Sequence, residues 1–180
     1  MKRQIRNSVF ETNSSSTHAM CISKDPVDMN TYSGCYVEFT HGKFGWEWGI
    51  YNSLKNKAAY LYQALISCYG RNAWDEEKDM DKFNEYLDKL SSILGEYGIT
   101  CSFEAPTVDE WGYDKGYIDH GGETKEFVEA LFEDSGLLLR YLFNNDSYIV
   151  TGNDNDDYPE DDVTREDFNP DRSKYDVYWK

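Results

Sequence analysis

The chain has 180 residues, enough for one domain, and it is strongly acidic, with a formal net charge of −16. Domains that bind nucleic acid normally carry the opposite sign, so this charge argues against direct DNA or RNA binding and favours a basic partner. The acids are concentrated in one half of the chain. Residues 99–180 hold 21 acids and seven bases, whereas residues 1–98 hold 13 acids and 11 bases.

The chain up to about Tyr51 predicts short strands joined by turns. His18, Met20 and Ile22 share one phase of an alternating pattern, which puts His18 on the inward side of a strand. Before this strand, the hydroxyl-rich stretch from Thr12 to Ser16 predicts a turn, because its side chains can bond local backbone groups. The same alternation occurs in CYVEFT and WEWGIY, which predict two further strands.

Two helices are predicted next. The first runs from about Asn52 to Tyr69, with one apolar stripe on its surface and Gly70 as its stop. The second starts near Asp75, a residue type that caps helices well, and ends at Gly98. Consecutive helices joined by a short connection predict a helical hairpin.

Strands and one more helix are expected after the hairpin. ITCSFE and GYIDH predict strands, and a third helix begins around Gly122 to Thr124. We expect Gly136 to break or kink this helix before LLLRYLF. SYIVT predicts a buried strand, and a final strand is predicted by the alternation of Tyr175, Val177 and Trp179.

This order of elements predicts an α+β fold, in which short antiparallel strands pack with a helical hairpin and a third helix. We expect residues 1–151 to form one compact domain. Residues 152–180 are expected to form an acidic, turn-rich C-terminal segment that docks back on the same domain.

The cysteines, the first residues and the lengths of the apolar runs indicate where in the cell the protein acts. Four cysteines without a Cys-x-x-Cys pair, and three histidines without zinc spacing, predict a reduced protein with no metal and no cofactor. The first residues lack the apolar core of a signal peptide, and no apolar run is long enough to span a membrane. These features predict a cytoplasmic protein that does not contact membranes.

Serine, histidine and a carboxylate stand together in FETNSSSTH, and the same side chains form the active sites of many hydrolases. A serine nucleophile needs a base within hydrogen-bond reach and a third group that orients the base, and adjacency in sequence does not provide this arrangement. No Gly-x-Ser-x-Gly elbow is present either. We therefore expect His18 to be a partly buried, hydrogen-bonded histidine rather than a catalytic base.

Two later segments carry polar residues where strands end. Asp119 and His120 precede two glycines at a helix start, which can bind an anion, although a tight turn is the simpler explanation. Asp154 and its acidic neighbours offer oxygen ligands for Mg²⁺ or Ca²⁺, yet they lack EF-hand spacing and are expected to form a solvated loop. A site that combined these segments would suit a metal-assisted hydrolase or transferase, with His18, Asp119, His120 and Asp154 as its residues.

The acidity supports a different hypothesis. Between Asp146 and Asp176 there are 11 acids and three bases, with aromatic residues among them. Proteins read DNA, whose duplex carries one charge per ~1.7 Å, through lysine and arginine, so a rigid acidic surface would compete for such a groove. The alternative is a segment that is merely solvated. On the DNA-mimic hypothesis the contact carboxylates are Asp154, Asp156, Asp157, Glu160, Asp161, Asp162, Glu166 and Asp167.

Three segments of the chain, RNSVFETNSSSTHAMCI, GYIDHGG and SYIVTGNDND, resemble a group of small proteins from phages and mobile elements of Firmicutes. The shared motifs are Phe10 to His18, Tyr117 to His120 and Thr151 to Asn155. Within that group the chain resembles type II-A anti-CRISPR proteins, which inhibit Cas9. The resemblance assigns no catalytic role to these motifs.

The resemblance implies a binding protein, not an enzyme, that acts in the cytoplasm of the bacterial host. Its partner would be Cas9 or the Cas9–guide RNA complex, and it would block target DNA binding or cleavage. Cas9 has a positively charged channel and PAM-reading arginines, so an acidic half-chain suits that surface.

Overall fold

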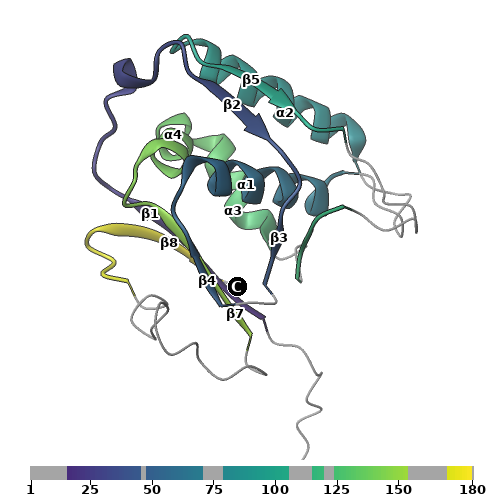
Figure 1. Ribbon diagram of the computed structural model, residues 1–180, viewed down its shortest axis with the longest axis vertical. Helices are drawn as coiled ribbons and strands as arrows, with labels where there is room; N and C mark the ends of the chain where they lie inside the picture. Colours follow the sequence, from purple (N-terminus) through teal and green to yellow (C-terminus); the bar gives the residue numbers. More distant parts are fainter. Residues whose placement is uncertain are drawn as a thin grey trace, which may run out of the picture.

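The computed structural model describes residues 16–45, 48–70, 79–105, 115–119, 124–153 and 170–179. An antiparallel sheet of four strands, in the order β4-β7-β1-β8, lies on one side of helices α1, α3 and α4 (Figure 1). The elements are β1 (Ser16–Ser23), η1 (Met29–Tyr32), β2 (Tyr36–Phe39), β3 (Lys43–Phe44), β4 (Gly49–Tyr51), α1 (Leu54–Cys68), α2 (Met80–Gly95), β5 (Thr100–Phe103), β6 (Tyr117–Ile118), α3 (Lys125–Glu133), α4 (Ser135–Phe143), β7 (Tyr148–Asn153) and β8 (Tyr175–Trp179).

This arrangement confirms the predicted α+β class, with one difference in the strands. The main sheet is antiparallel as expected, but β2 pairs with β5 and β3 pairs with β6 in parallel. Parallel neighbours need a long connection, and here α1 and α2 lie between β2 and β5 in the chain. No helix among the described residues is both long and apolar enough to cross a membrane.

Strand β1 forms with the predicted phase. Met20 and Ile22 lie in the main core on the helical side of the sheet, and His18 is fully buried. Ala19 and Cys21 belong to a smaller hydrophobic cluster with Val150. Because successive side chains of a strand point to opposite faces, the sheet separates these two clusters.

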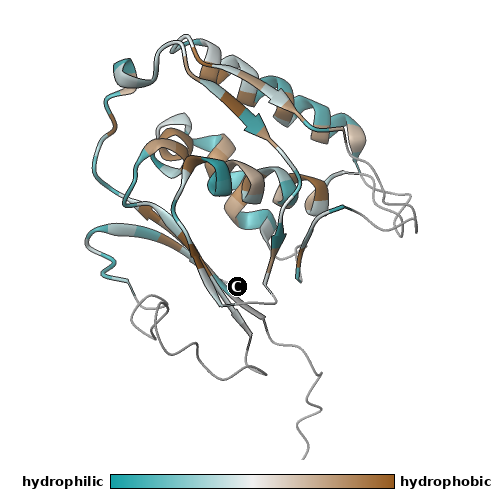
Figure 2. Cartoon of the chain, viewed as in Figure 1, coloured by the Kyte–Doolittle hydropathy of each residue, from teal (hydrophilic) through white to brown (hydrophobic). Residues whose placement is uncertain are grey.

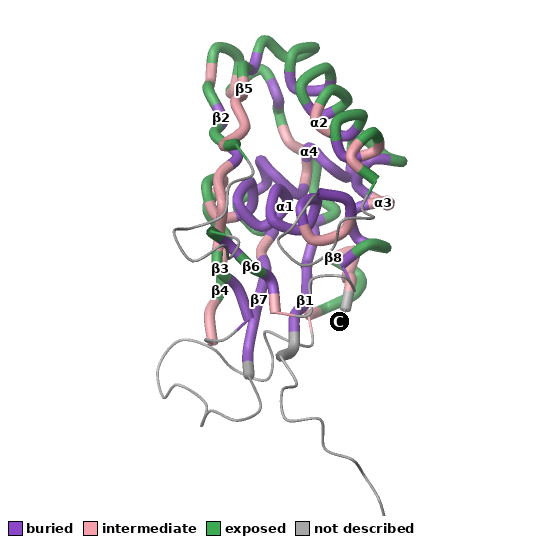
Figure 3. The backbone as a smooth tube through the Cα atoms, turned by 90° about the vertical axis from the view of Figure 1, so that its right-hand side faces the viewer, coloured by how far each residue is buried: buried purple, intermediate pink, exposed green. Residues whose placement is uncertain are grey.

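Helix α1 lies at the centre of the molecule and is buried on all sides, which the single predicted stripe does not anticipate. Every residue from Lys57 to Ile66 is buried (Figure 3). The helix packs against α3 and α4 and against α2, β2 and β6 (Figure 1). Hydrophobic residues therefore concentrate around α1, while the outer turns of α2 are hydrophilic (Figure 2).

Helix α2 begins at Met80, and the predicted start near Asp75 is wrong. Asp79 is not helical (φ −79°, ψ 81°), and its carboxylate accepts a hydrogen bond at 2.9 Å from the backbone N–H of the third helical residue. Asp79 is therefore the N-cap. The helix ends at Gly95, three residues before the predicted end, and Gly98 closes the following turn with a positive φ of 70°.

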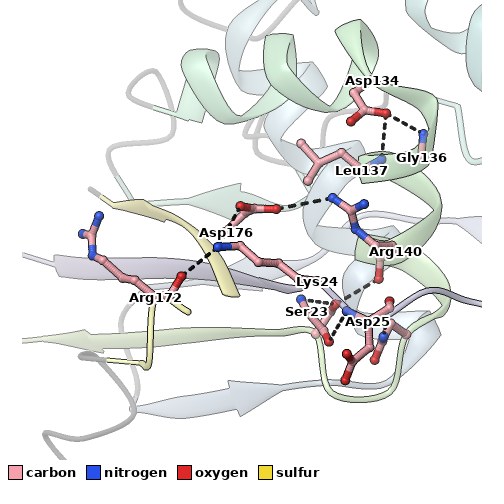
Figure 4. A network of polar contacts seen from close by, with 11 residues as sticks. Ser23, Lys24, Asp25, Asp134, Gly136, Leu137, Arg140, Arg172 and Asp176 are labelled. Atoms are coloured by element: carbon pink, nitrogen blue, oxygen red, sulfur yellow. Dashed lines mark hydrogen bonds and ion pairs between the residues drawn. The ribbon is translucent and has the colours of Figure 1, made fainter. Parts of the chain in front are cut away.

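The predicted third helix is two helices, α3 and α4, and they meet at Asp134 rather than at Gly136. The Asp134 carboxylate accepts hydrogen bonds from the backbone N–H groups of Gly136, at 2.8 Å, and Leu137, at 3.2 Å (Figure 4). Gly136 consequently belongs to the first turn of α4. The break was predicted two residues too late, because a capping carboxylate and not the glycine starts the new helix.

Strand β8 is held to the rest of the fold by charged groups as well as by its pairing with β1. Asp176 lies between two cations, with its carboxylate 3.3 Å from the Arg140 guanidinium and 3.7 Å from Lys24 Nζ (Figure 4). Lys24 Nζ also donates to the Arg172 carbonyl at 2.7 Å. These contacts connect β8 to α4 and to the end of β1, so the predicted final strand is present and anchored.

Candidate functional site

His18 is the centre of the first candidate site. Its side chain is fully buried on the helical face of β1, and its Nδ1 lies 3.3 Å from the Tyr60 hydroxyl of α1. That hydroxyl also donates to Met20 Sδ at 3.4 Å. Burial raises the pKa of Tyr60 well above its usual range, so this phenol stays protonated at neutral pH. The prediction of an inward-facing, hydrogen-bonded histidine is confirmed, although His18 is fully rather than partly buried.

Gly45, just after β3, brings His18 and Asp119 to the same place. Its φ is +111°, and a Cβ on Gly45 would lie 2.8 Å from His18 Nε2 and 2.8 Å from Asp119 Cβ. The Asp119 backbone N–H donates to the Phe44 carbonyl at 3.0 Å, which fixes the end of β6 beside β3. A side chain at position 45 would separate the two polar residues, and only glycine lets them approach this closely.

The described residues of the three motifs quoted from the sequence meet at this end of the sheet. In the register of β1 and β7, His18 lies opposite Thr151 and Ser16 lies opposite Asn153. The motif around Asp119 reaches the same place through Gly45. Segments distant in sequence therefore converge on His18, a result that the sequence alone leaves open.

Two of the four proposed catalytic residues, His18 and Asp119, are thus brought together. The other two, His120 and Asp154, lie outside the described residues. Within the part of the chain that the structure describes, no group of three or more His, Cys, Asp or Glu side chains could hold a metal ion.

Sequence reasoning misses Tyr60 and Gly45 as members of this site. Tyr60 falls outside the predicted apolar stripe of the first helix. It lies instead in the almost unbroken apolar run AAYLYQALI, and that run is the signal for a helix buried all round. No comparable signal marks Gly45, because its role depends on two residues from other strands.

The second candidate site is the acidic segment after β7. All eight proposed contact carboxylates, from Asp154 to Asp167, lie outside the described residues, so they stay a prediction. The structure does describe both points at which this segment is attached. Strand β7 ends at Asn153 opposite Ser16, and β8 begins at Tyr175 opposite Ser23.

Those attachment points lie at opposite ends of β1. Both β7 and β8 run antiparallel to β1, one on each side of it, so residues 154–174 connect one end of the sheet with the other. Seven residue steps along β1 at ~3.3 Å each separate the two ends by about 23 Å. The connecting residues hold nine acids and three bases. A DNA duplex of that length carries about 13 phosphate charges.

A hollow of about 390 Å³ lies elsewhere, between β2 and the start of α1. Its walls carry one acid and one base, Glu38 and Lys55, and none of the residues proposed from the sequence line it.

We compared the chain with known families, proteins and structures. No protein-family model, no curated protein and no solved structure matches the chain.

Proposed function

We propose that this protein is an anti-CRISPR protein that binds Cas9, or the Cas9–guide RNA complex, and blocks target DNA binding or cleavage. The acidic connection between β7 and β8 occupies a surface that would otherwise hold DNA. In this role the protein is a binding protein and not an enzyme. It needs no cofactor, makes no direct contact with nucleic acid or membranes, and works in the cytoplasm of a bacterial host.

One observation carries this proposal. The nine acids and three bases of residues 154–174 are tethered at both ends to one sheet, and the tethers are about 23 Å apart. Attachment at both ends keeps these acids within reach of the sheet, whereas the acids of a free tail could move away from it. Cas9 binds DNA in a positively charged channel, which is the complementary surface.

Charge reversal tests the mechanism. Replacing Asp154, Asp156, Asp157 and Asp161 with lysine should slow association with guide-loaded Cas9 about tenfold or more at low salt, because steering by opposite charges is lost. The salt dependence of association should weaken in the same variant. Surface plasmon resonance at several salt concentrations, together with a DNA-cleavage assay, measures both effects.

A matched control separates local charge from net charge. Asp81, Glu85, Asp88 and Glu96 are exposed on or just beyond α2, and their replacement with lysine changes the net charge by the same amount. This control should associate at a rate within about threefold of wild type, since its charges are in the wrong place. Inhibition that survives the first variant unchanged would overturn the mimicry mechanism.

One specific observation supports a second candidate function, that of an enzyme. His18 and Asp119 lie on either side of Gly45, where the shared motifs converge. With His120 and Asp154 they would form the site of a metal-assisted hydrolase or transferase. Such an enzyme would act on many substrate molecules, whereas an occluding inhibitor works near one equivalent of its target.

A further inference from the structure

A polar hollow of about 320 Å³ opens where the acidic half of the chain joins the sheet. Its volume lies at the lower end of the range for small-ligand pockets. It is lined by residues from strands β4, β7 and β8, from the turn before α1, and from the loop between α4 and β7. These residues are Ile50, Asn52, Asn145, Asp146, Tyr148 and Tyr175.

Two tyrosines form one wall of this hollow. The rings of Tyr148, on β7, and Tyr175, on β8, meet edge to face with their centroids 5.7 Å apart across β1. Both side chains are only half-buried, and Ile50 is 38% exposed. The hollow therefore offers aromatic and apolar surface beside its polar groups, which is typical of sites that bind an amphipathic side chain.

The electrostatic character of the hollow is negative. Asp146 is exposed at its rim, and the ion pairs between described residues do not involve this carboxylate. Burial raises the pKa of Tyr175, and the charges of Asp146, Asp25 and Asp171 raise it further. The negative field of several carboxylates is therefore felt at the Tyr175 hydroxyl.

Among the described residues, the buried cation near this hollow is Lys57, and it already donates hydrogen bonds to the backbone. Lys57 Nζ donates to the carbonyls of Asn144, at 2.6 Å, and Ser147, at 3.1 Å, on either side of the loop that carries Asp146. Lys57 therefore supports this loop, and no ion pair within 4 Å joins it to the Asp146 carboxylate among the described residues.

We infer that this hollow binds one arginine side chain of a basic partner protein. A guanidinium group can pair with Asp146, stack on the exposed face of one of the two tyrosine rings, and donate its remaining N–H groups to the amide oxygens of Asn52 and Asn145. Arginine suits this set better than lysine, because its planar group has five donors and stacks on aromatic faces. Buried arginine–aromatic contacts of this kind often dominate the energy of an interface.

The inference deepens the proposed function and rests on it for the identity of the partner, since Cas9 reads DNA through arginines. The hollow lies at the anchored edge of the acidic segment, beside the start of β8. An arginine bound there would fix the orientation of the partner, while the acids of the connection supply the longer-range attraction.

The test uses two small probes and the full chain. N-acetyl-arginine amide and N-acetyl-citrulline amide have nearly the same shape, but only the first is charged. In an NMR titration, the arginine probe should shift the backbone signals of Asp146, Tyr148 and Tyr175 in a saturable way. The citrulline probe should bind about fivefold or more weakly, because it lacks the charge that Asp146 and the rings recognise.

A pair of variants locates the effect. Asp146→Asn keeps the shape of the side chain and should remove the preference for arginine over citrulline, whereas Asp88→Asn, an exposed acid on α2, should keep it. Equal shifts with both probes, or an unchanged preference in Asp146→Asn, would overturn the inference. Neither probe involves Cas9, so arginine binding without Cas9 binding would contradict the proposed function alone.

Discussion

Replacing Lys57 with methionine should lower the free energy of unfolding by about 2–4 kcal/mol. Lys57 is 1% exposed, and its ammonium group satisfies the carbonyls of Asn144 and Ser147 at the C-terminal end of α4. Methionine fills a similar volume but leaves both buried acceptors without their donor, and each costs about 1–3 kcal/mol. Relief from burying a charge offsets part of this loss.

The burial of Lys57 should also make the free energy of unfolding depend on pH. Burial lowers the pKa of Lys57 to about 8, although the nearby Asp146 carboxylate opposes the shift. Below pH 8 the native and unfolded chains both carry the proton, so this group adds no slope. Between about pH 8 and 10.5 only the unfolded chain keeps it, so wild-type stability should rise with pH relative to Lys57→Met.

Urea unfolding from pH 7 to 10.5 measures both effects. Lys55 is an exposed lysine on the same helix, and Lys55→Met serves as the control, with an expected change within about 0.5 kcal/mol. If Lys57→Met were as stable as this control, the ammonium group would not be holding the end of α4.

The second large effect is expected at Gly45. Gly45→Ala should destabilise the fold by about 2–5 kcal/mol, from backbone strain at a positive φ together with steric overlap. The new methyl group would lie 2.8 Å from both His18 Nε2 and Asp119 Cβ, and the backbone φ of residue 45 is +111°. Neither contact can be relieved by moving only the far end of a flexible side chain, because Asp119 Cβ is next to the backbone.

Alanine substitutions at two other glycines distinguish the effect of backbone strain from that of steric overlap. Gly34 has a φ of +82° with nothing within 4 Å of a Cβ, so Gly34→Ala should show only the strain, about 1–2 kcal/mol. Gly95 has neither problem and ends α2, so Gly95→Ala should be neutral or stabilising. Thermal unfolding of the three variants should rank them in that order. A Gly45→Ala variant no less stable than Gly34→Ala would show that His18 and Asp119 do not converge there.

Local patterns anticipate much of the fold for physical reasons that act within a few residues. The alternation through His18, Met20 and Ile22 identifies the inward face of β1, because a strand repeats every two residues. The last strand follows from the same rule. Helix ends were less predictable, since Asp79 and Asp134 replace the expected Asp75 and Gly136, and several nearby residues can cap equally well.

Features that depend on distant parts of the chain could not be predicted in this way. The all-round burial of α1 arises because α2, α3, α4, β2 and β6 all pack against it. The parallel pairing of β2 with β5 likewise depends on how the intervening helices pack.

The candidate site illustrates the same limit. The sequence identifies His18 and Asp119 as candidates, but their proximity depends on Gly45, whose neighbours come from β1 and β6. No local pattern marks Lys57 as a buried residue, because its two acceptors lie about 90 residues further along the chain. The acidic connection could be predicted from composition, whereas its attachment at both ends of β1 required the fold.

The central claim, that the chain is an occluding inhibitor of Cas9, is tested most directly by titrating DNA cleavage with the wild-type protein while measuring its binding to apo and guide-loaded Cas9. We predict binding to at least one of these forms and complete inhibition near one equivalent of the inhibitor per Cas9. Complete inhibition at a small fraction of an equivalent would favour the enzyme with His18 and Asp119 in its site. Absence of binding to both forms would contradict the account.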